Sequence, residues 1–273
     1  MISEYLNHLE QVRGLSPCTL RAYEHDLRKF ASWARHNVAT PQWSAISQAD
    51  VEAWVRSMTT AGAQASSVKR QVSALRSFYR FHVHQGTLTK NPAQWVCSPK
   101  QQHKLPSTMA MSDVVATVHD TSEDTETRAL VALMAETGMR ISEALAVSTH
   151  DVTPATRVIR VHGKGSKERV VSYGETTRQL LNAVMGTRRG MVFVNKPERE
   201  YRREVWFALG RHTTATKHSP HIIRHTWACE HLSNGTDIKT LSAMMGHVSV
   251  KTTEIYAQVA GARLLQSFNN VRI

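Results

Sequence analysis

The chain has 273 residues, more than a typical single domain, which predicts two compact units that are each large enough to bury a core. Lys and Arg number 34 against 22 Asp and Glu, so the formal charge is +12, which favours a polyanionic partner such as nucleic acid, with a membrane surface as the competing polyanion. The longest apolar run, Ala129 to Ala135, is far shorter than the roughly 20 residues of a transmembrane helix, and the acidic opening does not resemble a secretory signal, so we expect a cytoplasmic protein without membrane contact.

Four amphipathic helices are expected in the first third of the chain. Ser16 is placed to cap a helix that has Pro17 at its first position, and Ser47 and Asp50 stand in the capping-box relation. Apolar residues recur at three- and four-residue steps behind these caps. The expected helices cover residues 3–14, 15–36, 47–58 and 66–86, and together they predict a helical domain over residues 1–97.

Basic side chains on the fourth expected helix lie largely off its apolar line, and the net charge favours DNA phosphate as their partner over the alternative of a solvated helix face. The segment 98–110 is interrupted by prolines and has no periodicity, which predicts a linker with further basic residues. The candidate DNA contacts of the helix and the linker are Lys69, Arg70, Arg76, Arg80, Lys100 and Lys104.

Residues 111–273 mix helical and strand signals. Alternating apolar residues flank a Gly-rich turn between residues 157 and 173, which predicts a β-hairpin, and residues 191–194 are a candidate further strand. Helices are expected around residues 127–138, 174–186, 203–210, 220–232, 237–246 and 250–259. The fold class is therefore mainly α, with a second domain that is mostly helical and contains a small antiparallel sheet.

An arginine that follows a helix-breaking glycine is the first candidate for chemistry. Gly138 is expected to end one helix, which places Arg140 at the N-terminus of the next, where backbone N–H groups and the helix dipole favour a phosphate. Glu143, three residues on, can hold that guanidinium or a neighbouring His. The alternative is an ordinary surface ion pair.

A second set of candidates follows towards the C-terminus. His221 and Arg224 are three apart on one expected helical face, and Arg224 together with Arg140 is suited to grip both non-bridging oxygens of one phosphodiester. Lys164 lies between two glycines at the expected hairpin tip, from which an ammonium can protonate a leaving oxygen. The surrounding string lacks the spacing of a nucleotide-binding loop, and a solvated tip is the alternative.

Tyr256 is the candidate nucleophile. A phenol has a pKa near 10, so it attacks poorly at neutral pH unless nearby cations and a His favour the phenolate. The alternative is a packing residue on an amphipathic helix.

Metal chemistry is disfavoured by the spacing of the possible ligands. His221 and His225 lie four apart, yet no Glu follows His221 in the manner of a zinc hydrolase and no third ligand stands nearby. Cys18, Cys97 and Cys229 are scattered and odd in number, which argues against a disulfide scaffold and against a Cys-based zinc site.

Taken together, the candidates contain the parts of one reaction, metal-free phosphoryl transfer through a covalent intermediate. Two Arg and two His would stabilise a five-coordinate phosphorus, a Lys would protonate the leaving oxygen and a Tyr would attack. The predicted catalytic residues are Arg140, Lys164, His221, Arg224, His247 and Tyr256, with Glu143 as an accessory residue and no metal or other cofactor.

The order and spacing of these residues resemble the tyrosine recombinases of the phage integrase and Xer type. The matching stretches are "LSPCTLRAYEHDLRKF", "TGMRISEAL", "VHGKGSKERVV" and "SPHIIRHTWACEHLSNGTDIKTLSAMMGHVSVKTTEIYAQV". The resemblance assigns catalytic roles to the six residues named above. It also implies a SAM-like four-helix core-binding domain, a catalytic domain over residues 111–273, a 3′-phosphotyrosyl intermediate and a Holliday junction.

The resemblance further implies partners. They are double-stranded DNA with inverted half-sites and a homo-tetramer, or a hetero-tetramer, that exchanges strands without ATP. The segment from Gly261 to Ile273 carries Leu264, Leu265 and Phe268 at helical spacing and is expected to dock on a neighbouring protomer, with folding back on its own domain as the alternative. Two other functions stay open: relaxation of DNA by a type IB topoisomerase, and a non-catalytic DNA-binding regulator on the same scaffold.

Overall fold

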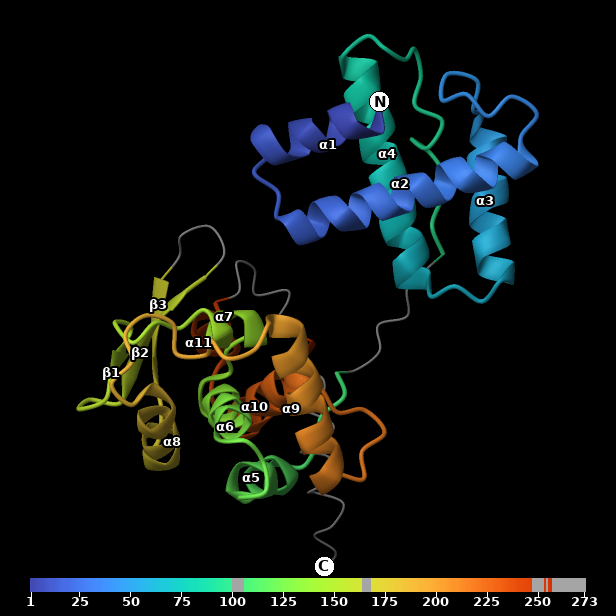
Figure 1. Cartoon of the computed structure of the whole chain (residues 1–273). Helices are drawn as coiled ribbons and strands as arrows, with labels where there is room; N and C mark the ends of the chain where they lie inside the picture. Colours follow the sequence, from blue (N-terminus) through green and yellow to red (C-terminus); the bar gives the residue numbers. More distant parts are fainter. Residues whose placement is uncertain (100–105, 164–167, 247–252, 254, 257–273) are drawn as a thin grey trace, which may run out of the picture. The chain divides into compact units, whose positions relative to one another are not determined.

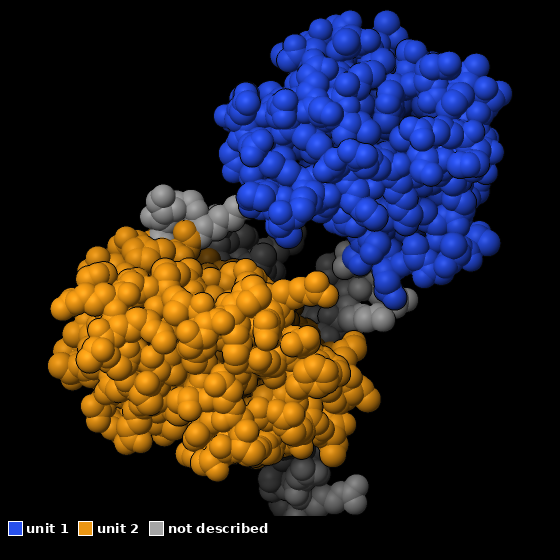
Figure 2. Space-filling model, viewed as in Figure 1, with its two compact units in different colours: residues 1–103 blue, residues 104–273 orange. Residues whose placement is uncertain are grey.

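Two compact units make up the chain, Met1–His103 and Lys104–Ile273 (Figure 2). The computed structural model describes residues 1–99, 106–163, 168–246, 253 and 255–256. The predicted boundaries, 1–97 for the first domain, 98–110 for the linker and 111–273 for the second domain, stay a prediction.

The first unit consists of α1 (Ile2–Gln11), α2 (Pro17–Asn37), α3 (Gln48–Thr60) and α4 (Ala65–His84) (Figure 1). Helix α4 contacts each of the other three helices. The predicted caps are confirmed: Ser16 accepts from the Thr19 amide with Pro17 at the first helical position, and Ser47 and Asp50 form a capping box. These signals work because they depend only on neighbouring residues along the chain.

Aromatic side chains dominate the core of the first unit. Phe30 packs edge to face on Trp54 with ring centroids 4.8 Å apart, and Phe78 lies 4.5 Å from Trp43. Tyr79 is also buried, and its hydroxyl donates to the Trp43 carbonyl at 3.0 Å. Edge-to-face contacts of this kind add to the free energy of apolar burial, so the four helices share one continuous core.

The second unit is built around α6 (Thr125–Thr137), which contacts helices on several sides. The apolar run of the sequence, Ala129 to Ala135, lies in this helix, and burial from several directions explains why it is apolar nearly all round. The other helices of the unit are α5 (Met111–His119), α7 (Ile141–Leu145), α8 (Glu175–Met185), α9 (Glu198–His212), α10 (Pro220–Ser233) and α11 (Ile238–Met244).

A three-stranded antiparallel sheet completes the second unit, in the order β1 (Val152–Thr153), β2 (Val158–His162) and β3 (Glu168–Ser172). The predicted hairpin is confirmed, with Val158 opposite Ser172 and His162 opposite Glu168. The mainly α fold class with a small antiparallel sheet is therefore confirmed.

Three elements differ from the sequence prediction. Residues 191–194 form no strand and contribute a single bridge, from Met191 to Ser148, although Val192 and Phe193 are buried. Helix α5 and strand β1 were not expected. The predicted helix 250–259 lies largely outside the described residues. No helix in the described part of the chain has the length and apolar character needed to cross a membrane.

Candidate active site

The turn between α6 and α7 positions the first arginine. Gly138 ends α6 in the left-handed conformation with a φ of 63°, and Arg140 becomes the N-cap residue of α7, as predicted. A Cβ on Gly138 would lie 2.4 Å from the ring of Trp227, which belongs to α10. Glycine is therefore required at this position for two reasons, the positive φ and the close approach of α10.

Replacing Gly138 with Ala is expected to destabilise the second unit by more than Gly235→Ala does. Both glycines have a positive φ, 63° and 87°, which costs an L-residue about 1–2 kcal/mol. A Cβ on Gly235 meets nothing within 4 Å, so only Gly138→Ala also has to displace Trp227. Urea unfolding of both variants measures the difference, and equal losses would show that the contact with Trp227 adds no strain.

The carboxylate of Glu143 joins two arginines. It accepts from Arg140 Nη1 at 2.7 Å and from the Arg140 amide at 2.9 Å. It also accepts from Arg169 Nη2 at 2.8 Å. Burial opposes ionisation of the carboxyl, but the bonds from Arg169 and Arg140 outweigh it and lower the pKa of Glu143 to about 2. Glu143 is thus an anion at neutral pH that holds both guanidiniums.

The sequence prediction missed Arg169. It lies on β3, and its Nε is buried without a hydrogen-bond partner among the described residues. The guanidinium packs against Gly246, where an added Cβ would lie 3.0 Å from Nη1. Strand alternation was the available signal, because it places Arg169 on the same inner face as Val171 and Tyr173, where an unpaired charge is unfavourable.

Arg224 is the most buried arginine of the site. It lies on α10, which begins at Pro220, and only 4% of its surface is exposed. Nη1 donates to the Gly138 carbonyl at 2.5 Å, and Nη2 donates to the Met245 carbonyl at 2.7 Å. Nη1 also lies 3.8 Å from Oε2 of Glu143. Burial and the positive charge of Arg140 lower its pKa to about 10. Arg224 therefore stays charged at neutral pH and ties the end of α6 to the end of α11.

His221 and Arg224 share the first part of α10, as predicted. His221 is exposed as a residue. Partial burial lowers its pKa, and the positive fields of Arg202, Arg224 and Arg140 act in the same direction. The imidazole of His221 thus lies within the electrostatic reach of both predicted phosphate-binding arginines.

Tyr256 is buried, with 3% of its surface exposed. Its Oη is hydrogen-bonded to Nδ1 of His225 at 2.8 Å. Burial raises the pKa of the phenol, while Arg224 and Arg140 oppose that rise. From the sequence alone, the nearby cations are expected to stabilise the phenolate. In this structure burial outweighs them, so Tyr256 is neutral at pH 7.

Four of the six predicted catalytic residues are therefore brought together from positions up to 116 residues apart, Arg140 being the first and Tyr256 the last. Glu143 joins them, and Arg169 and His225 are additional members. Lys164 and His247 lie outside the described residues. They follow directly on Gly163 at the end of β2 and on Gly246, the glycine against which Arg169 packs.

The predicted DNA contacts on α4 have different environments. Lys69 and Arg80 are exposed. Arg70 remains 45% exposed and forms an ion pair with Asp26, which is buried. The guanidinium of Arg76 is hydrogen-bonded within the first unit. Its Nε donates to the Ala93 carbonyl at 3.0 Å, and its Nη2 donates to the Val96 carbonyl at 2.9 Å. The phosphate contacts of these residues stay predictions, and Lys100 and Lys104 lie outside the described residues.

Arg76→Ala is expected to lower the stability of the first unit, whereas Arg80→Ala is expected to weaken DNA binding. Loss of the two Arg76 bonds should lower the free energy of unfolding of the first unit by at least about 1.5–3 kcal/mol, the range for a single hydrogen bond to a charged group. Arg80 is exposed, so its removal should leave stability within about 0.5 kcal/mol and weaken DNA binding, with a salt slope smaller by about 1.

Urea unfolding and DNA-binding anisotropy at several salt concentrations measure both effects. A stable Arg76→Ala variant with a reduced salt slope would instead place Arg76 on phosphate.

Within the described residues, one cluster has the spacing of a metal site: Asp120, Glu123 and His212. Asp120 is bonded to His212 at 2.9 Å, and Glu123 is paired with Arg211. The cluster contains none of the predicted catalytic residues, and its two carboxylates are already paired with His212 and Arg211. An acidic cluster of this kind assigns no ion.

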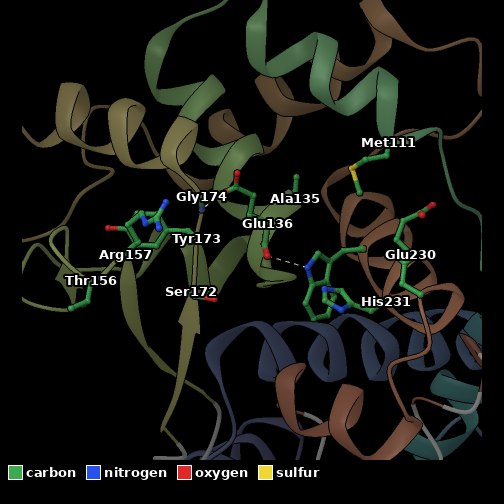
Figure 3. A pocket seen from close by; sticks show the side chains of 12 residues that line it. Met111, Ala135, Glu136, Thr156, Arg157, Ser172, Tyr173, Gly174, Glu230 and His231 are labelled. Atoms are coloured by element: carbon green, nitrogen blue, oxygen red, sulfur yellow. Dashed lines mark hydrogen bonds between the residues drawn. The ribbon is translucent and has the colours of Figure 1, made fainter.

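A hollow of about 590 Å³ lies elsewhere in the second unit (Figure 3). Glu136, Trp227 and His231 contribute to its wall. Trp227 Nε1 donates to the Glu136 carbonyl at 3.1 Å, and the Glu136 carboxylate accepts from the Gly174 amide at 2.6 Å. Among the residues that the structure describes, the wall of this hollow includes no predicted catalytic residue.

Comparisons with known proteins cover both units. Residues 107–263 match the phage integrase family, and residues 2–86 match the phage integrase N-terminal SAM-like domain. A tyrosine recombinase XerC from Pelobacter propionicus is 32% identical over 280 residues, which cover 96% of this chain and 91% of the relative. A tyrosine recombinase XerD from Oceanobacillus iheyensis is 26% identical, with 98% of this chain and 97% of the relative covered.

Solved structures give the same fold. The XerH site-specific recombinase bound to palindromic difH substrate, in a post-cleavage complex, superposes with a TM-score of 0.78 at 18% identity, covering 98% of this chain and 84% of that one. A lambda integrase dimer bound to a COC′ core site gives a TM-score of 0.71 at 16% identity, covering 92% and 96%.

Proposed function

The chain belongs to the phage integrase family and is a tyrosine site-specific recombinase, and from that membership we propose that Tyr256 cleaves duplex DNA by forming a 3′-phosphotyrosyl bond. The observation that carries the proposal is the convergence of Tyr256 with Arg224 and Arg140. A phenol within the electrostatic reach of two guanidiniums supplies a nucleophile near a cationic region that suits one phosphodiester.

The two arginines would bind the non-bridging oxygens of the scissile phosphate. Arg224 is buried and anchored on two backbone carbonyls, so it offers a fixed charge that needs little reorganisation during the reaction. Arg140 is half-exposed and anchored by Glu143. Glu143 therefore acts as a positioning residue, and Arg169 offsets part of its negative charge so that the site stays cationic for a phosphate.

The remaining roles rest on the family resemblance. Lys164 would protonate the 5′-oxygen as it leaves, and His221 and His247 would donate to the phosphate oxygens. The phosphotyrosyl ester conserves the free energy of the broken phosphodiester bond, which rejoining then uses. Strand exchange therefore proceeds without ATP, metal or cofactor.

The proposed partner is double-stranded DNA with inverted half-sites, on which a tetramer exchanges strands through a Holliday junction. Support comes from the DNA complexes of the structural relatives, one of which holds a palindromic substrate. The net charge of +12 is consistent with this partner. The segment from Gly261 to Ile273, proposed to dock on a neighbouring protomer, lies outside the described residues, and the cytoplasmic location belongs to the same proposal.

A selected DNA site tests the proposed function. Binding sites are first enriched from random-sequence duplexes with the full chain. A duplex nicked close to the expected cleavage position then traps the protein on DNA, because the short released strand diffuses away. Denaturing gels should show a covalent complex, and two intact sites should yield four-way junctions.

The same substrates separate the other candidate functions. Relaxation of a supercoiled plasmid without junctions would identify a type IB topoisomerase. Specific binding without any covalent complex would identify a non-catalytic regulator and reject the proposed cleavage.

A further inference from the structure

Two histidines of α10 occupy different environments. His221 is exposed near its start and senses Arg140, Arg202 and Arg224. His225 follows one helical turn later, is half-buried, and has its Nδ1 2.8 Å from Oη of Tyr256. The centroids of the imidazole and phenol rings are 5.4 Å apart. The histidine in contact with the nucleophile is therefore not the one that the sequence prediction included.

The Tyr256 end of this hydrogen bond is buried. Tyr256 belongs to a buried cluster with Trp227, Cys229, Leu241 and Met245. Because Tyr256 is buried, its hydroxyl proton needs an acceptor within hydrogen-bond reach. Its hydrogen-bond partner His225 is the group placed to receive that proton.

The charged and titratable groups near His225 all act in one direction, whereas those near Tyr256 oppose one another. Burial lowers the pKa of His225, and His221 and Arg224 lower it further. Around Tyr256 the influential groups are Arg224, Cys229 and Arg140. At neutral pH the imidazole of His225 is therefore uncharged, and in the tautomer that carries hydrogen on Nε2 its Nδ1 accepts from the phenol.

We propose that His225 is the general base that takes the proton from Tyr256 when the phosphodiester is attacked. The proposal rests on the proposed function, because it assigns a partner to the nucleophile of that reaction. It follows from the contact itself: His225 touches the reacting oxygen, as a general base must.

The step balances as follows. The O–H bond of Tyr256 breaks and its proton passes to Nδ1 of His225, which becomes an imidazolium. The Tyr256 oxygen bonds to phosphorus, the bond from phosphorus to the 5′-oxygen breaks, and the leaving oxygen takes a proton from the general acid, assigned above to Lys164. In rejoining, the 5′-hydroxyl gives its proton back to Lys164 as its oxygen bonds to phosphorus, the bond from phosphorus to the Tyr256 oxygen breaks, and the imidazolium returns its proton to that oxygen.

Electrostatics explains why transfer would await DNA. An imidazolium at His225 is unfavourable beside Arg224 in the DNA-free chain. A phosphate bound by Arg224 and Arg140 brings a negative charge close to His225, which raises the proton affinity of the imidazole. The phenol stays neutral until a substrate arrives, and only then gains a base that can hold its proton.

Single-turnover capture on the nicked substrate tests the proposal. His225→Gln keeps a hydrogen-bonding side chain that does not titrate, and it should lower the capture rate by about 10²-fold, the lower range for general acid–base catalysis. The wild-type rate should fall as the pH drops through the pKa of His225, because the protonated ring accepts no proton. That acid limb should be absent in His225→Gln. Added imidazole should restore part of the rate to His225→Ala.

Two further variants are controls for His225→Gln. His231→Gln changes a half-buried histidine of the same helix that contacts Thr236, and should retain the wild-type rate and pH profile. His221→Gln should lower the rate yet keep the acid limb that belongs to His225. Melting curves and DNA affinity verify that each variant is folded.

The failure of this inference differs from the failure of the proposed function. If wild-type protein forms the covalent complex while His225→Gln keeps its rate and acid limb, His225 is not the base and the proposed function stands. The assignment would also be overturned if His225→Ala folds and binds DNA but added imidazole does not raise its capture rate. Absence of any covalent complex with wild-type protein rejects the proposed function and this inference with it.

Discussion

Replacing Tyr256 with Phe is expected to abolish covalent capture of cleaved DNA and to leave DNA binding intact. The change removes the attacking oxygen and no other atom. The ring stays in its buried cluster, so the fold loses only the hydrogen bond to His225, which is worth about 1 kcal/mol. Capture on the nicked substrate and anisotropy on the intact duplex measure the two properties separately.

Tyr173→Phe provides the matched control for this variant. Tyr173 is buried in the same unit, and its hydroxyl has no hydrogen-bond partner in the described part of the chain. Removal of that hydroxyl should leave capture at the wild-type rate. A covalent product that persists in Tyr256→Phe would reject Tyr256 as the nucleophile.

Arg224→Lys is expected to slow cleavage by roughly 10²-fold or more, the loss that follows removal of one donor to a developing oxyanion. A guanidinium has five N–H donors in a planar fork, so it can anchor on backbone carbonyls and bind phosphate from one position. Arg224 spans the carbonyls of Gly138 and Met245 in this way. An ammonium group is a point charge and reproduces neither the span nor the two-pronged phosphate contact.

The control and the readout separate lost chemistry from lost structure. Arg203→Lys changes an arginine of α9 whose side chain is 65% exposed, and should cleave at the wild-type rate. Melting temperatures report how far Arg224→Lys loosens the contact between α6 and α11, while single-turnover rates at saturating protein report cleavage. Near-normal cleavage by Arg224→Lys would show that the forked phosphate contact is wrong.

Local signals accounted for most of the helices. Ser16 with Pro17, and Ser47 with Asp50, mark helix starts because caps involve residues within one turn of each other. The hairpin of β2 and β3 followed from alternation around a glycine turn. Residues 191–194 have the same apolar character as a strand but find no partner strand, and the sequence of one segment contains no information about its partners.

The candidate site shows the same division. The sequence identified Arg140, Glu143, Arg224 and Tyr256 by residue type, order and spacing. It did not identify Arg169 or His225, because an arginine in a strand and a histidine in a helix are ordinary until their neighbours are known. It also grouped Arg76 with the phosphate contacts, although that guanidinium bonds to carbonyls 17 and 20 residues further along the chain.

The sequence by itself determined the helical periodicity, the two-part organisation, the basic character and the set of residue types for phosphoryl transfer. Only the tertiary structure decided that Tyr256 is buried and neutral, that His225 contacts it, and that Glu143 is shared by two arginines. The physical reason is the separation along the chain between the residues that determine each property. Periodicity and caps depend on neighbours within a few residues, whereas burial, pKa and the partner of a hydrogen bond depend on packing between distant segments, such as the 31 residues that separate His225 from Tyr256.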